Sequence, residues 1–252
     1  MRKDYRPQAT TAETWTRALG AAPEDPAAEV GQSEFWKVIE PWVDELPLPA
    51  RVVDAGCGQG GLALFLARRG FEVTGLDTSE PIIDALGKRF PEVDWRVADV
   101  RATRLPAESA DVYLSAGVFE HFEDGPGACL AEARRVLKPR GLLFVSVPFE
   151  NARLAFAEQF ARVASPGDGE HFYQWRLTRA DLVREVSAAG FDVLFVRPGN
   201  AEGGARRALH ELFSLDPASR TSARLSGLAA RFVPAAIIGH MVFAAARKPE
   251  PV

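Results

Sequence analysis

One stretch of the sequence, Arg51 to Asp77, constrains the fold of this chain more than any other part. It reads RVVDAGCGQGGLALFLARRGFEVTGLD: a short apolar run that ends on Asp54, closely spaced glycines, and apolar residues with helical spacing over 62–69. A glycine ends this segment, and a second apolar run, 71–76, precedes Asp77. The pattern predicts a strand, a glycine loop, a helix and a second strand, which together form the βαβ unit that binds nucleotide-like ligands.

Each part of this unit has a physical reason. Glycine can take positive φ angles and lets a ligand approach the backbone without meeting a Cβ atom. The helix that follows points its unpaired N–H groups at the loop. Asp77 ends the second strand, where a carboxylate can accept hydrogen bonds from both hydroxyls of a ribose. Such charge-assisted bonds contribute roughly 1.5–3 kcal/mol each.

The glycine spacing allows two cofactors. Gly56-x-Gly58-x-x-Gly61 fits the dinucleotide pattern, so NAD(P) is one of them. Asp54-x-Gly56-x-Gly58-x-Gly60 fits the D/E-x-G-x-G-x-G loop of the class I S-adenosylmethionine (SAM) methyltransferases. The chain resembles that family here, and in particular its small-molecule members with DAGCG-type loops, the methyltransferase type 11 and quinone-biosynthesis-like group.

Composition narrows the class of protein. A length of 252 residues suits one domain, and 47% hydrophobic with 25% charged residues is ordinary for a globular protein. The formal net charge is −4 and no basic block occurs, which argues against a nucleic-acid partner. The first ten residues, MRKDYRPQAT, contain no apolar signal-peptide core, so we expect a cytoplasmic location. The sequence does not indicate the oligomeric state.

Strand-like and helical segments alternate with short connections along most of the chain. This alternation predicts an α/β fold with a doubly wound parallel sheet and helices on both faces. The resemblance implies a Rossmann-like sheet of seven strands, mostly parallel, with the last strand antiparallel. The further strands are expected at 93–98, 111–115, 142–147, 191–196 and 240–246, and helices at 79–89, 126–137 and 179–189.

We expect two parts along the chain. Residues 1–46 would form an N-terminal helical cap, with a helix over 12–19, and residues 47–252 the methyltransferase domain, with helical insertions at about 151–180 and 200–235. The apolar run 232–246 is shorter than the roughly 20 residues of a membrane span and contains proline and glycine, so it predicts a buried strand. A weak association of residues 205–239 with a lipid surface stays open.

The resemblance extends beyond the glycine loop, over roughly 48–199 and 240–247. The segment 111–122 is similar to the family's fourth strand and the turn after it. The letters RVLKP at 135–139 are similar to its RVLKPGG turn, with Arg140 in place of the first glycine.

By that resemblance, the cofactor-binding residues come from the ends of four strands. The loop would hold the methionine end of SAM, Asp77 the ribose, and Asp99 the amino group of adenine. The full expected set is Asp54, Ala55, Gly56, Gly58, Gly60, Asp77, Thr78, Ser79, Asp99, Val100, Ser115 and Ala116.

The oxidoreductase alternative is weaker on the sequence. Short-chain dehydrogenases use Tyr-x-x-x-Lys, and the three tyrosines of this chain are followed four positions later by Ala9, Gly117 and Leu177. No G-x-x-x-x-G-K-[ST] loop occurs, so a P-loop NTPase is excluded. We therefore predict a SAM-dependent methyltransferase, with an NAD(P)-binding oxidoreductase or a SAM-binding protein without transferase activity as alternatives.

The catalytic and substrate residues are less determined than the cofactor residues. His121 follows the fourth strand and titrates near neutrality, so it is the candidate general base, whereas a structural turn is the competing explanation. In quinone O-methyltransferases a similar Glu-His pair joins an upstream acid at a metal; that position here is Gly117, so no metal is predicted. The acceptor would be a small, partly apolar metabolite with an O, N or C nucleophile. Candidate substrate residues are Glu120, Phe149, Phe172, Tyr173 and Trp175, for which core packing is the competing explanation.

Overall fold

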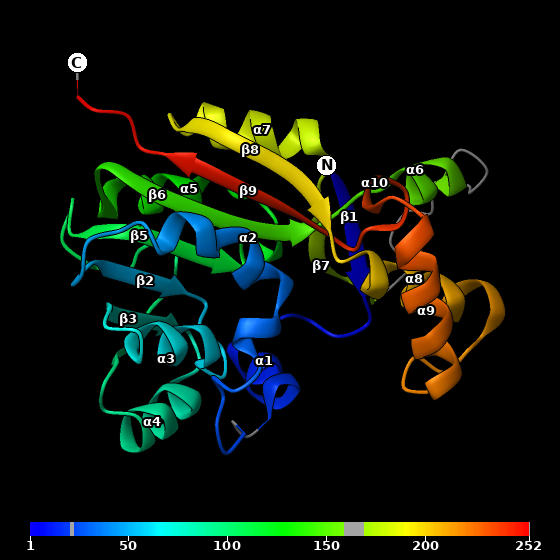
Figure 1. Cartoon of the computed structure of the whole chain (residues 1–252), viewed down its shortest axis with the longest axis horizontal. Coiled ribbons are helices and arrows are strands. Elements are labelled where there is room, and N and C mark those ends of the chain that lie inside the picture. The colour runs from blue at the N-terminus through cyan, green and yellow to red at the C-terminus, as the bar shows by residue number, and fades with distance from the viewer. Residues whose placement is uncertain (21–22, 159–168, 252) are drawn as a thin grey trace.

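The computed structural model describes residues 1–20, 23–158 and 169–251. Its centre is a seven-stranded sheet with the strand order β4-β3-β2-β5-β6-β9-β8 (Figure 1). Only β9 runs antiparallel to its neighbours, which confirms the predicted topology. The strands are β2 (Arg51–Ala55), β3 (Glu72–Asp77), β4 (Asp94–Val97), β5 (Ala110–Ala116), β6 (Leu137–Pro148), β8 (Asp192–Gly199) and β9 (Met241–Arg247).

Helices cover both faces of the sheet, because successive strand residues point to opposite sides and both sides are apolar. On one face, Val52 packs in a cluster with α2 and α3; on the other face, Val53 packs in a cluster with α5 and α7. Two helices begin where the sequence indicates, at the capping residues Ser33 and Thr178. The bounds are α2 (Glu34–Val43), α3 (Gly61–Ala67), α4 (Glu80–Arg89), α5 (Gly127–Val136) and α7 (Arg179–Ala188).

The turn in which Arg140 replaces the glycine of the family lies inside a strand. The segment 137–148 is assigned to β6 as a whole, and Arg140 has a φ angle of +65°. Arginine thus takes, at a position where the family has glycine, a left-handed conformation that glycine adopts more readily.

A second, two-stranded sheet was not predicted. β1 (Arg2–Arg6) pairs antiparallel with β7 (His171–Arg176), and α1 (Ala12–Leu19) follows β1 (Figure 1). The letters of β1, RKDYR, carry no apolar alternation, so its strand conformation depends on a partner about 170 residues away in the chain. The expected helix over 12–19 is present.

A group of helices stands apart from the sheet at the end toward which most strands point (Figure 1). α8 (Ala201–Phe213) and α9 (Arg220–Phe232) pack against each other, and α10 (Ala235–Ile238) and α6 (Ala152–Glu158) adjoin them. Part of the first expected insertion, 159–168, lies outside the described residues. Short 3₁₀ turns, η1 (Val30–Gln32) and η2 (Phe119–His121), complete the elements.

The apolar run 232–246 divides between α10 and the buried strand β9, as expected for a run too short to cross a bilayer. Within the described part of the chain, none of the helices has the length and apolar character that a membrane span requires.

Candidate functional site

A cavity of about 480 Å³ lies at the carboxyl ends of β2, β3 and β5. This is the edge where the strand order reverses, because β2 lies between β3 and β5, and open α/β sheets bind ligands there. Of the expected cofactor residues, seven line the cavity: Gly56, Gly58, Asp77, Thr78, Asp99, Val100 and Ala116. The lining does not include Asp54, Ala55, Gly60, Ser79 and Ser115.

The glycine loop folds tightly against the end of β3. The backbone N–H groups of Gly56 and Cys57 both donate to the carbonyl oxygen of Leu76, each at 2.8 Å. Gly56 has a φ angle of +81°, and a Cβ atom there would overlap the side chain of Val118, which also lines the cavity. The loop therefore needs glycine at this position both for its backbone angle and for space.

Replacing Gly56 with alanine is expected to lower the free energy of unfolding by about 2–4 kcal/mol, combining a left-handed alanine with an overpacked contact. Gly125→Ala is the matched control: Gly125 has a φ angle of +88°, but nothing lies within 4 Å of its would-be Cβ. The control should lose only about 1–2 kcal/mol. Urea denaturation measures both losses. Equal losses would show that the side chain of Val118 moves aside without lowering the free energy of unfolding.

Asp77 is held in place by the loop. Its Oδ2 accepts from the backbone N–H of Gly58 and its Oδ1 from that of Ser79, both at 3.0 Å. A carboxylate oxygen can accept a second bond, so both oxygens of this cavity-lining residue keep acceptor capacity. The geometry suits a vicinal diol such as that of a ribose.

Asp54 lies behind the loop and is only 4% exposed. Burial, with a smaller contribution from the charge of Asp77, raises its pKa to about 7, although a hydrogen bond from the backbone of Ala63 opposes the shift. Its Oδ2 accepts no hydrogen bond from any residue that the structure describes. A buried carboxylate oxygen without a partner is suited to a cationic donor, such as the ammonium group at the methionine end of SAM.

Asp99 lines the cavity but is already engaged. The guanidinium of Arg101 donates to both of its carboxylate oxygens, at 3.0 Å from Nε to Oδ1 and 2.6 Å from Nη2 to Oδ2. Arg101 thereby lowers the pKa of Asp99, and its guanidinium also lies 4.5 Å from the ring centre of Phe122. Asp99 keeps lone pairs for an adenine amino group, yet the sequence did not indicate its pairing with Arg101.

His121 lies on the cavity wall, at the end of η2. Its Nδ1 is 2.8 Å from the carbonyl oxygen of Tyr173. Because a carbonyl can only accept, Nδ1 carries the proton, and the lone pair of the neutral ring is on Nε2. Burial lowers the pKa of His121; the bond to Tyr173 opposes this and the charge of Arg6 adds to it. The ring is therefore a neutral base at pH 7.

Glu120 lies beside this histidine, with its Oε1 3.8 Å from His121 Nε2. It is 3% exposed, and burial raises its pKa to about 8, so most of it is protonated at pH 7. A neutral carboxyl at this distance gives His121 no anionic partner that would raise its pKa.

The expected aromatic substrate wall does not line the cavity. Phe172 and Trp175 pack on each other at 5.8 Å between ring centres, with Lys3 of β1 next to both. Phe149 is buried in the core. Tyr173 is outside the lining too, although its ring centre lies 5.1 Å from that of His121 and 6.4 Å from that of Trp15, which both line the cavity.

The N-terminal segment, for which the sequence predicts a cap, contributes residues of α1 and of the segment before it to the lining of the cavity. The hydroxyls of Thr16 and Ser79 lie 2.6 Å apart, and Gln59 Nε2 donates to the carbonyl oxygen of Leu19 at 2.6 Å. The ring of Trp15 is 4.6 Å from that of His121. Lining residues that the sequence analysis missed are Thr10, Thr11, Ala12, Trp15, Leu19, Ala98, Arg101, Gly117, Val118 and Phe122. The one signal available in the sequence was a tryptophan on a short amphipathic helix.

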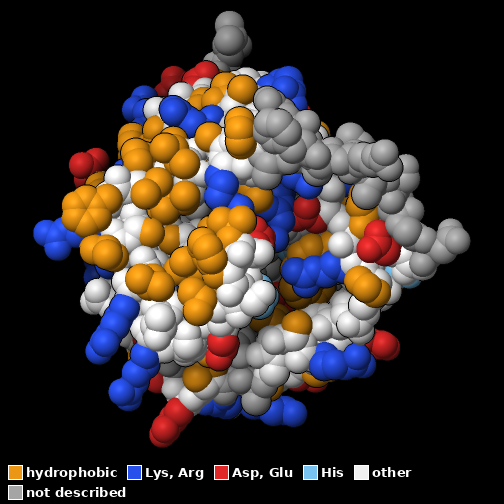
Figure 2. Space-filling model, turned by 90° about the vertical axis from the view of Figure 1, so that its right-hand side faces the viewer, with side chains coloured by type: hydrophobic (Ala, Val, Ile, Leu, Met, Phe, Trp, Pro, Cys, Tyr) orange, Lys and Arg blue, Asp and Glu red, His pale blue; other side chains and the backbone are white. Residues whose placement is uncertain are grey.

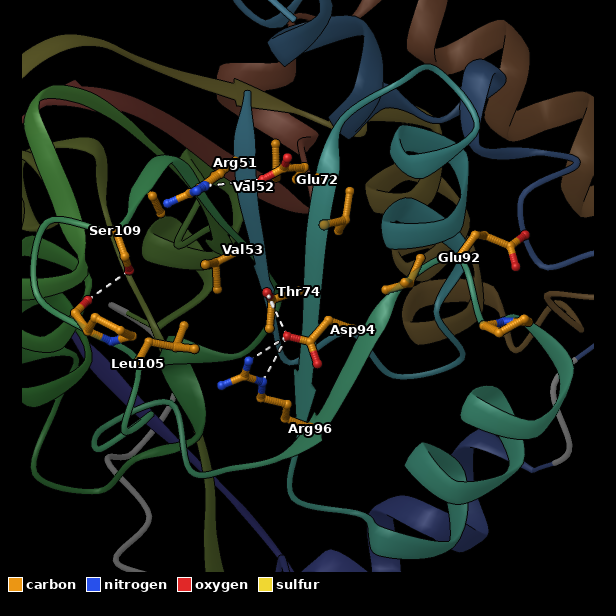
Figure 3. A pocket seen from close by; sticks show the side chains of 15 residues that line it. Arg51, Val52, Val53, Glu72, Thr74, Glu92, Asp94, Arg96, Leu105 and Ser109 are labelled. Atoms are coloured by element: carbon orange, nitrogen blue, oxygen red, sulfur yellow. Dashed lines mark hydrogen bonds and ion pairs between the residues drawn. The ribbon is translucent and has the colours of Figure 1, made fainter. Parts of the chain in front are cut away.

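A larger hollow, of about 560 Å³, lies at the opposite end of the same strands (Figure 3). Its charged side chains pair with one another: Arg51 with Glu72, and Arg96 with Asp94. These side chains are about half exposed, and the glycine loop lies at the opposite, carboxyl ends of the strands. The smaller cavity is therefore the candidate site.

A metal site is not evident in the described ranges 1–20, 23–158 and 169–251, where no three His, Cys, Asp or Glu side chains come together as metal ligands would.

Known proteins resemble this sequence. The methyltransferase domain family matches residues 53–145. A probable S-adenosylmethionine-dependent methyltransferase of Mycolicibacterium smegmatis is 33% identical over 160 residues, covering 62% of this chain and 59% of that protein. Ubiquinone biosynthesis O-methyltransferases of Paracidovorax citrulli and Caulobacter vibrioides are 32% and 39% identical, covering 62% and 54% of this chain and 70% and 59% of their own lengths. The chain thus spans about 59–70% of these relatives.

Solved structures share the fold at low identity. The [4+2]-cyclase SpnF has a TM-score of 0.58 at 19% identity, covering 94% of this chain and 93% of that one. A Haloferax volcanii protein in complex with the Trm112 methyltransferase activator has a TM-score of 0.63 at 18% identity, covering 96% and 99%. A SAM-dependent methyltransferase of Methanosarcina mazei has a TM-score of 0.57 at 18% identity, covering 84% and 98%. These likenesses concern the fold alone.

Proposed function

Because the chain belongs to the class I SAM-dependent methyltransferases, we propose that it transfers the methyl group of SAM to a hydroxyl oxygen of a small, partly apolar metabolite. Membership implies SAM as the methyl donor, in preference to NAD(P). The observation that carries the proposal is the cavity in which the glycine loop, the carboxylate of Asp77 and the neutral ring of His121 meet.

The residues around the loop fit SAM in the expected manner. Asp77 would accept hydrogen bonds from the ribose hydroxyls, with Thr78 beside it. The unpartnered Oδ2 of Asp54 would accept a hydrogen bond from the ammonium group at the methionine end of SAM. Asp99 and Val100 hold the adenine. Ser79 does not line the cavity and would act indirectly, because its hydroxyl contacts that of Thr16 in α1.

An oxygen acceptor is favoured by two observations. A hydroxyl must lose its proton during transfer, and His121 has an unprotonated Nε2 on the cavity wall. The relatives from Paracidovorax citrulli and Caulobacter vibrioides are O-methyltransferases by name. Trp15, Val118 and Phe122 supply apolar lining for the rest of the acceptor.

The chemistry then divides between cofactor and protein. When bound, SAM supplies a methyl group on a positively charged sulfur, which needs no further activation. His121 Nε2 would take the hydroxyl proton as the acceptor oxygen forms its bond to the methyl carbon and the bond from that carbon to sulfur breaks, which leaves S-adenosylhomocysteine. The protein aligns the two reactants, which can contribute about 7–11 kcal/mol to lowering the barrier. Residues 1–46 act as the cap that excludes water.

The affinity for SAM is expected to fall as the pH is lowered through about 7. The pKa of Asp54 in the free protein is about 7, so at lower pH the carboxyl is protonated and neutral, and the cationic ligand must displace that proton. Titration calorimetry between about pH 6 and pH 8 measures the trend. Asp54→Asn should bind more weakly at pH 8 and lose the dependence; an unchanged slope in this variant would assign it to another group.

The proposed function is tested by calorimetry with SAM and with NADH, followed by mass spectrometry of a panel of phenols and enols incubated with the protein and SAM. SAM binding and a product heavier by one methylene support it. NADH binding without SAM binding would return the oxidoreductase alternative. SAM binding with no methylated product across oxygen, nitrogen and carbon acceptors would favour a binding protein or other chemistry on this fold, as in the cyclase.

A further inference from the structure

Helix α9 is amphipathic, but its apolar side faces outward. Leu225, Leu228 and Phe232 are spaced three and four positions apart, so they share one face, and they are 42%, 57% and 73% exposed. The face that packs inward carries Ser222 and Ser226, both fully buried. A soluble helix normally has the opposite arrangement, with its leucines in the core and its serines in water.

The apolar surface continues onto the neighbouring helix. Leu212 and Phe213, which end α8, are 64% and 68% exposed. Figure 2, which shows the side of the molecule where α8 and α9 lie, has apolar side chains gathered in one area with basic side chains around it. We call the two residues of α8 and the three of α9, five in all, the outer apolar face. A contiguous exposed patch of this kind is typical of an interaction surface.

The charges next to this face are all of one sign along α9. Arg220, Arg224 and Arg231 lie on a strip beside the leucines, and α9 contains no acidic residue. All three arginines are exposed, and none forms an ion pair with a residue that the structure describes. The arginines of α8, in contrast, are paired: Arg206 with Glu202 and Arg207 with Glu211.

We propose that the outer apolar face, with the arginine strip of α9, docks this protein onto a membrane surface rich in anionic lipids. Outward leucines and phenylalanine can enter the headgroup region while the arginines meet lipid phosphates, which is how interfacial helices bind. A second copy is a poorer occupant, because a two-fold contact through this face would bring two unpaired arginine strips together. The helices lie at the end of the molecule toward which most strands point, and the candidate site lies at the carboxyl ends of strands that point the same way (Figure 1).

Flotation of the full chain with vesicles tests the proposal. The chain should float with phosphatidylcholine vesicles that contain phosphatidylglycerol, remain in solution with phosphatidylcholine alone, and detach as salt is added. Replacing the three exposed apolar residues of α9 with serine should abolish flotation. Replacing its three arginines with glutamine should weaken it on the order of a hundredfold, at about fivefold for each charge.

Val97→Ser is the matched control, since Val97 is 51% exposed on β4, the edge strand at the opposite side of the sheet from β8. SAM affinity should stay unchanged in all variants and reports that they are folded. Failure of the wild-type chain to float, or equal flotation of the serine variant, would overturn the proposal. So would light scattering that shows a dimer which the serine variant dissociates, because the face would then join two copies.

Discussion

Replacing Asp77 with alanine is expected to weaken SAM binding by between about a hundredfold and ten-thousandfold. The carboxylate would accept from two ribose hydroxyls, and its oxygens also accept from the backbone of Gly58 and Ser79. The substitution therefore removes ligand bonds and releases two backbone N–H groups of the loop and the following turn. Titration calorimetry at pH 8 measures the loss.

Glu72→Ala provides the control at the other end of the same strand. Glu72 begins β3 and pairs with Arg51 on the surface, with both side chains more than half exposed. Such a pair contributes little to stability, so SAM affinity should be unchanged. If Asp77→Ala bound SAM as tightly as Glu72→Ala, the ribose assignment would fail, and with it the placement of the cofactor in this cavity.

Replacing His121 with glutamine is expected to lower kcat by about 10²–10⁴-fold while changing SAM affinity little. The base needs an unprotonated Nε2, and the bond from Nδ1 to the carbonyl of Tyr173 fixes that tautomer. Burial depresses the pKa of His121, so activity in the wild-type chain should rise with pH, with a midpoint below the ordinary histidine value of 6.5. The variant should lose this acidic limb.

His171→Gln is the matched control, because His171 lies exposed at the start of β7 and outside the cavity lining. It should leave kcat and the pH profile unchanged. An unchanged profile in His121→Gln with its kcat retained would show that the acceptor reacts without a base. A carboxylate or an amine acceptor would then replace the hydroxyl in the proposed reaction.

The fold was predictable because its signals are local. Apolar periodicity, the capping residues Ser33 and Thr178, and the glycines between β2 and α3 act within a few residues, so the alternation of strands and helices follows from neighbours in the sequence. The strand β1 was not predictable in this way. Its charged letters acquire a strand conformation only beside β7, from the far end of the chain.

In the candidate site, too, the residues close together in the sequence were predicted, and those that depend on distant contacts were not. The loop and Asp77 come from one contiguous stretch, so the sequence identified them together. Trp15 was missed because it reaches the cavity through a tertiary contact with His121. Arg101 pairs with Asp99 two positions away, but its place on the ring of Phe122 depends on tertiary packing. The sequence made Phe172 and Trp175 candidate substrate residues. Their spacing alone does not show whether their side chains face the cavity or β1.

Taken alone, the sequence determined the βαβ unit and indicated the family, because these depend on residue types at fixed short spacings. Only the tertiary structure decided which way surfaces face. It set the tautomer of His121 through a carbonyl 52 positions away, and it turned the leucines of α9 outward and its serines inward. Periodicity shows that a helix has two faces, but only packing against distant segments decides which of them is buried.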